Sequence, residues 1–302
     1  MMFHVCAILP HKGDIGPIQD FGPFGVDLFF VLSGVIIARI APGQGAGPFI
    51  WRRLTRILPL YWVLTLLWMA ALARLGRLDL AGVSRSLLLY PSAIDPYLNV
   101  AWTLRFELLF YFAAGLVLKW PRAAPVALAL GYAAAFVART AHSGVMLDFF
   151  GAPVILEFVA GLVIARLPGS RIGLALAGLG ALAGLVVIGV TGFHGDPASR
   201  EIYYGLPAAM IVYAATQVKA RGWLADRLAY LGDASYAAYL VHLIPIYVLA
   251  SFFGLAPVSI VGAMVVCWLI AILVHEGLER PLLAFCRRPF GRAFGVAVRS
   301  LP

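Results

Sequence analysis

Apolar residues form long runs along this chain, and most polar residues lie in the short segments between them. The runs cover roughly residues 24–40, 56–73, 101–118, 123–138, 149–165, 172–190, 202–218, 234–253 and 257–274. A helix needs about 20 mainly apolar residues to cross the hydrocarbon core of a bilayer. The pattern therefore predicts an all-α fold, a polytopic transmembrane helix bundle with nine full spans.

Residues 1–10 form a further, incomplete apolar run at the front of the chain. Ten helical residues rise only about 15 Å, half the thickness of the hydrocarbon core. We therefore expect a first span that is truncated at its start, within one integral-membrane domain covering 1–302.

Two polar segments have patterns of their own. The longest external connection, about 74–100, mixes leucines with arginines, which is typical of an amphipathic helix on the membrane surface. The segment 281–302 is basic and is expected to form a cytoplasmic tail that contacts anionic lipid headgroups.

Composition supports a membrane protein and excludes an ordinary soluble domain, because 62% of the residues are hydrophobic and 12% are charged. Placing residues 38–56 in the cytoplasm and alternating from there puts most of the 23 lysines and arginines on the cytoplasmic side. This bias favours that orientation, with a cytoplasmic C-terminus. The net charge of +9 is thus explained by topology and does not indicate a nucleic-acid partner. The three cysteines have no metal-ligand or redox spacing, so neither a metal site nor a bound cofactor is predicted.

Two carboxylates lie inside apolar runs. Glu107 is one to two turns into the run 101–118, where a charge costs about 2.5–3.5 kcal/mol on insertion scales. Such a cost is usually retained where the group faces a polar cavity, a partner charge or a substrate, so Glu107 is a candidate functional residue. Glu157 is a second such acid, for which a functional role and pairing with an arginine are equally good explanations.

Three arginines precede the apolar part of the second long run. Arg52 and Arg56 are four residues apart, and Arg53 and Arg56 are three apart, so a helix would bring their guanidinium groups together. A membrane anchor at the cytoplasmic headgroups is the commoner use of such a cluster. The functional interpretation is a phosphate-binding site for a nucleotide-like donor.

Four other polar residues in apolar surroundings each allow a structural and a functional interpretation. Asp27 suits a helix N-cap, and Ser33 beside Gly34 suits a helix-packing notch. His4 and His242 are most simply structural, as isolated histidines usually are. A membrane histidine together with a membrane glutamate is nevertheless a plausible acid/base pair.

The chain resembles the membrane-bound acyltransferase family 3, and particularly its exopolysaccharide O-acyltransferase branch. The motifs that carry the resemblance follow the family's order and lie at 25–34, 52–62, 101–111, 156–161, 231–236 with 239–242, and 279–281. The resemblance implies a ten-span protein of the bacterial inner membrane. Such a protein moves an acyl group, commonly acetyl, from cytosolic acyl-CoA to a sugar hydroxyl in an exopolysaccharide, its lipid-linked precursor or another glycoside.

The resemblance also implies roles for individual residues. His4 and Glu107 correspond to the catalytic pair, with His4 as general base or as an acyl-carrying relay, and Arg52, Arg53 and Arg56 correspond to the acyl-CoA-binding cluster. The residues implied to line the acceptor side of the site are Asp27, Ser33, Trp102, Tyr111, Glu157, Ser235, Tyr236 and His242.

One departure from the family concerns the first span. Members normally carry an arginine about ten residues before the histidine, whereas this chain begins three residues before His4. We therefore expect Met1 to be an internal start and an acyl-CoA contact to be missing. Two other functions compete: a transporter or flippase of lipid-linked sugars, whose ionisable groups would line a permeation path, and a non-catalytic part of a polysaccharide assembly complex. The pattern leaves the oligomeric state open.

Overall fold

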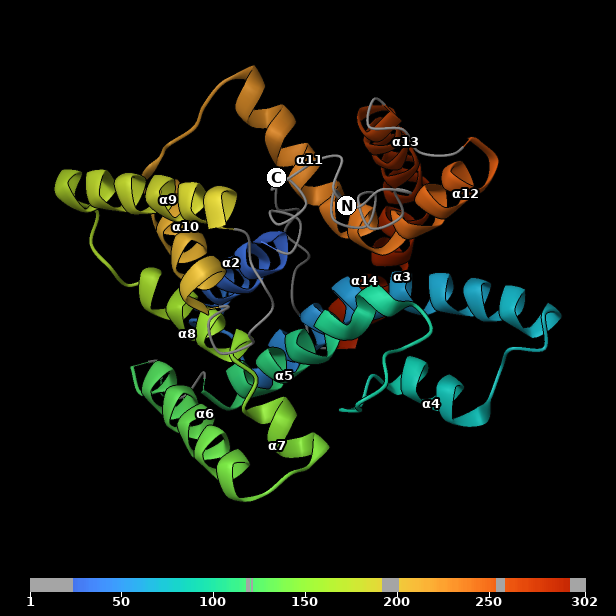
Figure 1. The fold of residues 1–302 in the computed structure, drawn as a ribbon, viewed down its shortest axis with the longest axis horizontal. Helices are drawn as coiled ribbons and strands as arrows, with labels where there is room; N and C mark the ends of the chain where they lie inside the picture. Colours follow the sequence, from blue (N-terminus) through green and yellow to red (C-terminus); the bar gives the residue numbers. More distant parts are fainter. Residues whose placement is uncertain (1–23, 118–119, 121, 192–200, 254–258, 294–302) are drawn as a thin grey trace.

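The computed structural model describes residues 24–117, 120, 122–191, 201–253 and 259–293, and within these ranges it contains helices and no strand. Figure 1 shows the helices crossing at varied angles. Their bounds are α2 Phe24–Ile40, α3 Ala46–Arg74, α4 Leu80–Leu88, α5 Trp102–Val117, α6 Ala124–Ala141, α7 Val145–Phe150, α8 Val154–Ile164, α9 Arg171–Thr191, α10 Leu206–Gln217, α11 Trp223–Val241, α12 Leu243–Phe253, α13 Ser259–Val274 and α14 Arg280–Ala293. Three short turns complete the described part: the 3₁₀ turn η2 Asn99–Ala101 and the π turns η3 Glu201–Gly205 and η4 His275–Glu279.

The all-helical prediction is confirmed for the described residues, because each of the nine apolar runs corresponds to one or two helices. Five helical stretches are long and apolar enough to cross a membrane: Ala46–Arg74, Ala124–Ala141, Val145–Ile164, Arg171–Val190 and Val261–Arg287. Many large apolar side chains lie on the outer surface of these stretches, among them Leu67, Leu130 and Leu269. Exposure of this kind suits contact with lipid.

Helix boundaries differ from the apolar runs where polar residues continue a helix. α3 begins ten residues before its run and includes the arginine cluster, since arginine is a good helix former. The run 234–253 is divided into α11 and α12, with His242 between them. The start of the expected basic tail, residues 281–293, lies in α14, which continues from α13 through η4 and packs against α3.

The external connection contains a short helix, α4, in place of a long surface helix. Asp79 caps it by accepting a hydrogen bond from the N–H of Gly82 at 2.6 Å, and the Tyr97 hydroxyl donates to the same carboxylate at 2.9 Å. These two hydrogen bonds, that of Gly82 first, lower the pKa of Asp79 below its ordinary value of 3.8. The connection is therefore tied together by its own polar groups.

Two glycines set the closest contact between helices. α2 lies against α8 and α10 (Figure 1), and the backbones of α2 and α8 meet at Gly34 and Gly161. A Cβ atom added at Gly161 would lie 2.0 Å from the carbonyl oxygen of Val31. The small-residue notch predicted at Ser33–Gly34 is thus a real packing surface, and it fixes the position of Ser33.

Candidate functional site

Helix α5 presents two adjacent stripes of side chains, each with the four-residue spacing of one helix face. Trp102, Phe106 and Phe110 form the aromatic stripe. Phe106 stacks on Phe149 of α7 with ring centroids 4.5 Å apart, and Phe110 stacks on Phe158 of α8 at 3.8 Å. These contacts fix the rotation of α5 about its axis.

The second stripe of α5 is polar and consists of Thr103, Glu107 and Tyr111, all buried. The hydroxyl of Thr103 lies 2.6 Å from that of Tyr239 on α11. Glu107 accepts a hydrogen bond from Ser33 of α2 at 3.3 Å, and Tyr111, one turn further along, interacts with the same carboxylate. The structure therefore brings together three residues that the sequence singled out separately.

Glu107 is buried but only partly paired. Its Oε2 has no partner of hydrogen-bonding geometry among the residues that the structure describes. Arg53, from α3, attracts the Glu107 carboxylate electrostatically. A buried carboxylate with spare hydrogen-bonding capacity can bind a polar ligand or hold a neighbouring histidine in place.

The three clustered arginines have different surroundings. Arg52 is exposed and donates to the side chain of Gln44 at 3.3 Å. Arg53 is half-buried, beside Glu107. Arg56 instead forms an ion pair with Glu279 and donates to the backbone carbonyl of Asp233 at 3.1 Å. The cluster thus has one exposed arginine, one half-buried arginine that interacts electrostatically with Glu107 and one held by contacts with η4 and α11.

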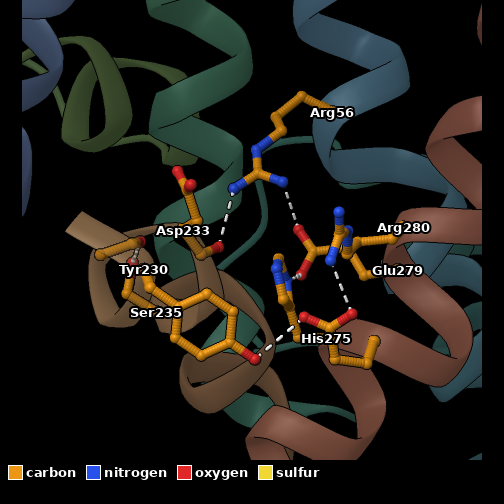
Figure 2. Close-up of polar contacts among 9 residues, drawn as sticks. Arg56, Tyr230, Asp233, Ser235, His275, Glu279 and Arg280 are labelled. Atoms are coloured by element: carbon orange, nitrogen blue, oxygen red, sulfur yellow. Dashed lines mark hydrogen bonds and ion pairs between the residues drawn. The ribbon is translucent and has the colours of Figure 1, made fainter. Parts of the chain in front are cut away.

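Arg56, Glu279 and His275 form a buried ionic cluster, shown in Figure 2. Glu279 is 1% exposed; one carboxylate oxygen binds Arg56, and the other lies 2.7 Å from Nδ1 of His275. The π turn η4 carries both His275 and Glu279. The aromatic ring of Tyr236 lies 6.0 Å from the Arg56 guanidinium, and its hydroxyl donates to the backbone carbonyl of Ile57. This cluster ties α3 to α11 and η4.

Next to this cluster lies a more exposed pair, also drawn in Figure 2: Glu276 accepts from Arg280 at 2.7 Å and from the Tyr230 hydroxyl at 2.9 Å. Ser235 is exposed and its hydroxyl donates to the carbonyl of Gly232, so it belongs to this surface region and lies apart from Glu107.

The other predicted site residues have separate positions. Asp27 is fully buried and lies in the first turn of α2, so its carboxylate is at the N-terminal end of the helix, as expected, but follows the N-cap position. Glu157 is buried on α8. Burial agrees both with a functional role and with pairing to an arginine, so both interpretations stand. Nδ1 of His242 lies 2.7 Å from the carbonyl of Tyr239, where α11 ends. His4 lies outside the described residues.

A pocket of about 190 Å³ opens beside the first turn of α5. Trp102 lines it together with residues that the sequence analysis did not select; these are Ser92, Ala93, Asp95, Arg105, Phe106, Val145, Asp148 and Phe149. Arg105 is buried, and its two terminal nitrogens donate to the carbonyls of Ser92 and Ile94 at 3.0 and 2.8 Å.

Among the residues that were not selected as site candidates, His275 and Glu279 have a signal in the sequence and the pocket residues have none. His275 and Glu279 are four residues apart at the end of an apolar run, the spacing at which side chains meet on a helix. The pocket residues come from three segments and have no shared spacing, so only the fold brings them together.

Comparisons with known proteins give a consistent picture. The family described as "Acyltransferase domain" matches residues 1–276. The chain is 36% identical to the exopolysaccharide production protein ExoZ of Rhizobium meliloti (strain 1021) over 310 residues, which is 94% of each protein. No solved structure matches.

Proposed function

Because the chain belongs to acyltransferase family 3, we propose that this membrane acyltransferase moves an acyl group, specifically acetyl, from cytosolic acyl-CoA to a sugar hydroxyl. Its similarity to a protein named for exopolysaccharide production supports an acceptor within an exopolysaccharide or its lipid-linked precursor.

The observation that carries this proposal is the state of Glu107. It is a buried carboxylate on an apolar helix that accepts from Ser33 and interacts with Tyr111, and its Oε2 has no partner of hydrogen-bonding geometry among the described residues. A charge in such surroundings is normally kept for function. Acyl transfer needs a group of this kind to orient and stabilise a general base.

Chemically, we assign the base to His4, which lies outside the described residues. His4 would take the proton of the acceptor hydroxyl as its oxygen attacks the thioester carbonyl. The tetrahedral intermediate then expels the CoA thiolate, and the proton passes from His4 to that sulfur. Glu107 would fix the orientation of His4 and stabilise its positive charge.

The donor side is assigned to Arg52 and Arg53. Arg52 is exposed, and Arg53 is half-buried and interacts electrostatically with Glu107, so the two suit the phosphates of CoA and the start of its pantetheine arm. The guanidinium of Arg56 is held by Glu279, and we assign it the role of fixing the start of α3.

Orientation follows from the same contacts. Arg56, Asp233 and Glu279 come from segments that charge counting assigns to the cytoplasmic side, and Arg56 contacts the other two. Asp95, Arg105 and Asp148 come from external segments or span starts and line one pocket. These groupings support an inner-membrane protein with donor and acceptor entering from opposite sides and a cytoplasmic C-terminus.

The test is acyl transfer by the purified protein in lipid nanodiscs, with labelled acetyl-CoA and deacylated exopolysaccharide from the producing strain. We expect acceptor-dependent release of CoA and label in the polysaccharide. Glu107→Gln and His4→Ala should each lower the rate by a factor of about 10²–10⁴, the usual contribution of acid–base groups.

A matched control is Glu276→Gln, which alters an exposed carboxylate and should leave the rate within about twofold, since exposed pairs contribute little. If the wild-type protein transported the glycan without releasing CoA, a transporter would be the correct function. Unchanged transfer in Glu107→Gln would remove Glu107 from the mechanism.

A further inference from the structure

The pocket beside the first turn of α5 is separate from the two carboxylate sites and has a lining of mixed chemistry. Its walls are Trp102, Phe106 and Phe149, with Phe106 and Phe149 stacked and Trp102 edge-on to Phe106 at 6.1 Å. Its polar groups are Asp95, Arg105 and Asp148. Flat aromatic walls with a few charged groups at the edge are typical of sites that bind one apolar ring face and several hydroxyls.

The size of the pocket limits what it can hold. At about 190 Å³ it is smaller than the roughly 300–1,000 Å³ of sites for drug-sized ligands. A single six-membered ring fits this scale, with the remainder of a longer chain outside the opening. Charged groups at three positions disfavour an acyl chain, because their desolvation would have no compensation from an apolar ligand.

Arg105 has one hydrogen-bonding group to spare. Its side chain is 6% exposed, and both terminal nitrogens are engaged by backbone carbonyls. Its Nε has no partner among the residues that the structure describes. Asp95 is 3.9 Å from the guanidinium, and Asp148 is 3.2 Å from Arg139, which is outside the pocket lining.

The two carboxylates make the pocket a poor site for an anion and a good one for hydroxyls. Asp95 and Asp148 would repel a phosphate or a carboxylate. Each can instead accept a hydrogen bond from a hydroxyl group, and an N–H of Arg105 can donate a hydrogen bond to a hydroxyl oxygen. The charges present therefore favour a neutral, hydroxyl-rich ring.

The pocket also lies close to the proposed reaction centre. Trp102 and Glu107 are separated by about 7.5 Å along the axis of α5. Phe106, a wall of the pocket, contacts Phe30 of α2, the helix that carries Ser33. A glycan that places one ring in the pocket would thus have its neighbouring ring near Glu107.

We propose that this pocket is the recognition subsite for a neutral pyranose ring of the acceptor glycan, with its aromatic walls on the ring face and Asp95 and Arg105 on its hydroxyls. The proposal rests on the proposed function in one respect, the identity of the acceptor as a glycan. The pocket residues position the acceptor and take no part in proton transfer.

The test measures both binding and turnover in nanodiscs, using oligosaccharides cut from the strain's exopolysaccharide and deacylated with mild alkali. We expect Asp95→Asn and Phe149→Ala to weaken binding and to raise the KM for the oligosaccharide by about tenfold, equal to 1.4 kcal/mol. The KM for acetyl-CoA and the kcat should stay within about twofold. Asp95→Asn preserves shape and is at a half-exposed side chain, so it keeps the test valid if Phe149→Ala fails to fold.

The matched control is Phe112→Ala, on the same helix but on its exposed side, which should change neither quantity. Turnover by the wild-type protein with unchanged binding in both pocket variants would overturn the subsite and leave the proposed function standing. A third outcome is that the wild-type protein binds the oligosaccharide, Asp95→Asn does not, and the wild-type protein shows no turnover. That outcome would support the subsite and overturn the acyltransfer proposal. Failure of the wild-type protein to bind the oligosaccharide would overturn the subsite.

Discussion

Two buried glutamates of this protein, Glu279 and Glu107, have similar burial but very different partners. Glu279 is 1% exposed, and its two oxygens bind Arg56 and His275. Glu107 is 4% exposed. Among the described residues, Ser33 alone makes a hydrogen bond of good geometry to it, at 3.3 Å, and Oε2 has none.

The difference agrees with a structural role for Glu279 and with the functional role that we propose for Glu107. Burying a charge is costly, and full pairing by Arg56 and His275 offsets that cost at Glu279. At Glu107 the offset is incomplete, so the group keeps the capacity to bind a substrate or a catalytic partner. Residues with equal burial can therefore have different roles, and the partners distinguish them.

The largest effect on stability is expected from breaking the Glu279 cluster. Arg56→Met leaves Glu279 buried without its main counter-charge, which should lower the free energy of unfolding by about 3–5 kcal/mol. Cys267 is fully buried, so its labelling by a thiol-reactive dye during heating reports unfolding in a Cys6→Ser/Cys286→Ser background.

Two controls sharpen this measurement. The double variant Arg56→Met/Glu279→Gln should recover part of the loss, because it removes the unpaired charge. Arg280→Met removes an exposed ion pair with Glu276 and should cost no more than about 0.5 kcal/mol. If Arg56→Met and Arg280→Met lowered the free energy of unfolding equally, the burial of the Glu279 cluster would make no difference to stability.

A smaller loss is expected at the glycine contact that holds Ser33 beside Glu107. Gly161→Ala would place a Cβ 2.0 Å from the Val31 carbonyl, so α2 and α8 must separate, at a cost of about 1–3 kcal/mol. Acyl transfer should fall as well, because Ser33 moves with α2. Gly131→Ala on α6, with open space at the added Cβ, is the control and should be neutral or slightly stabilising. A stable, fully active Gly161→Ala would contradict the role of this contact.

At Glu107 the sign of the effect should be reversed. Glu107→Gln removes an incompletely paired buried charge, so the same dye assay should show stability unchanged or raised by about 1 kcal/mol while acyl transfer is lost. Loss of activity together with a stability loss as large as that of Arg56→Met would place Glu107 in the structural class.

The smallest effect concerns Asp79, a carboxylate outside the spans. Hydrogen bonds from Gly82 and Tyr97 lower the pKa of Asp79 in the folded protein. Its contribution to stability is therefore fully present above pH 3.8 and is lost as the pH falls through the lower pKa of the folded state. Hydrogen-exchange protection of residues 80–88 should drop in the wild-type protein as the pH falls below 3.8. In Asp79→Asn, the protection of these residues should depend less on pH in this range. If the variant had the same pH profile as the wild-type protein, the Asp79 carboxylate would not stabilise the start of α4.

Several features were predictable from local sequence. The runs at 24–40 and 101–118 correspond closely to α2 and α5, because long apolar periodicity directly reflects burial in lipid or in a helical core. The charge of Glu107 within an apolar run was enough to select it as a candidate functional residue. The short length of α4 and the break at His242 were not predicted, since they depend on capping and on contacts with other segments.

By itself, the sequence determined an all-helical membrane protein and a carboxylate of unusual cost at position 107, because apolar run length and charge are local properties. The tertiary structure decided which polar groups meet. It paired Ser33 with Glu107, joined Arg56 to Glu279 and His275 across more than 200 residues, and gathered Asp95, Arg105 and Asp148 around one pocket. The four-residue spacing of His275 and Glu279 brings those two side chains together, but the contacts between distant segments arise from helix crossings, such as that of Gly34 with Gly161, which no spacing along the chain encodes.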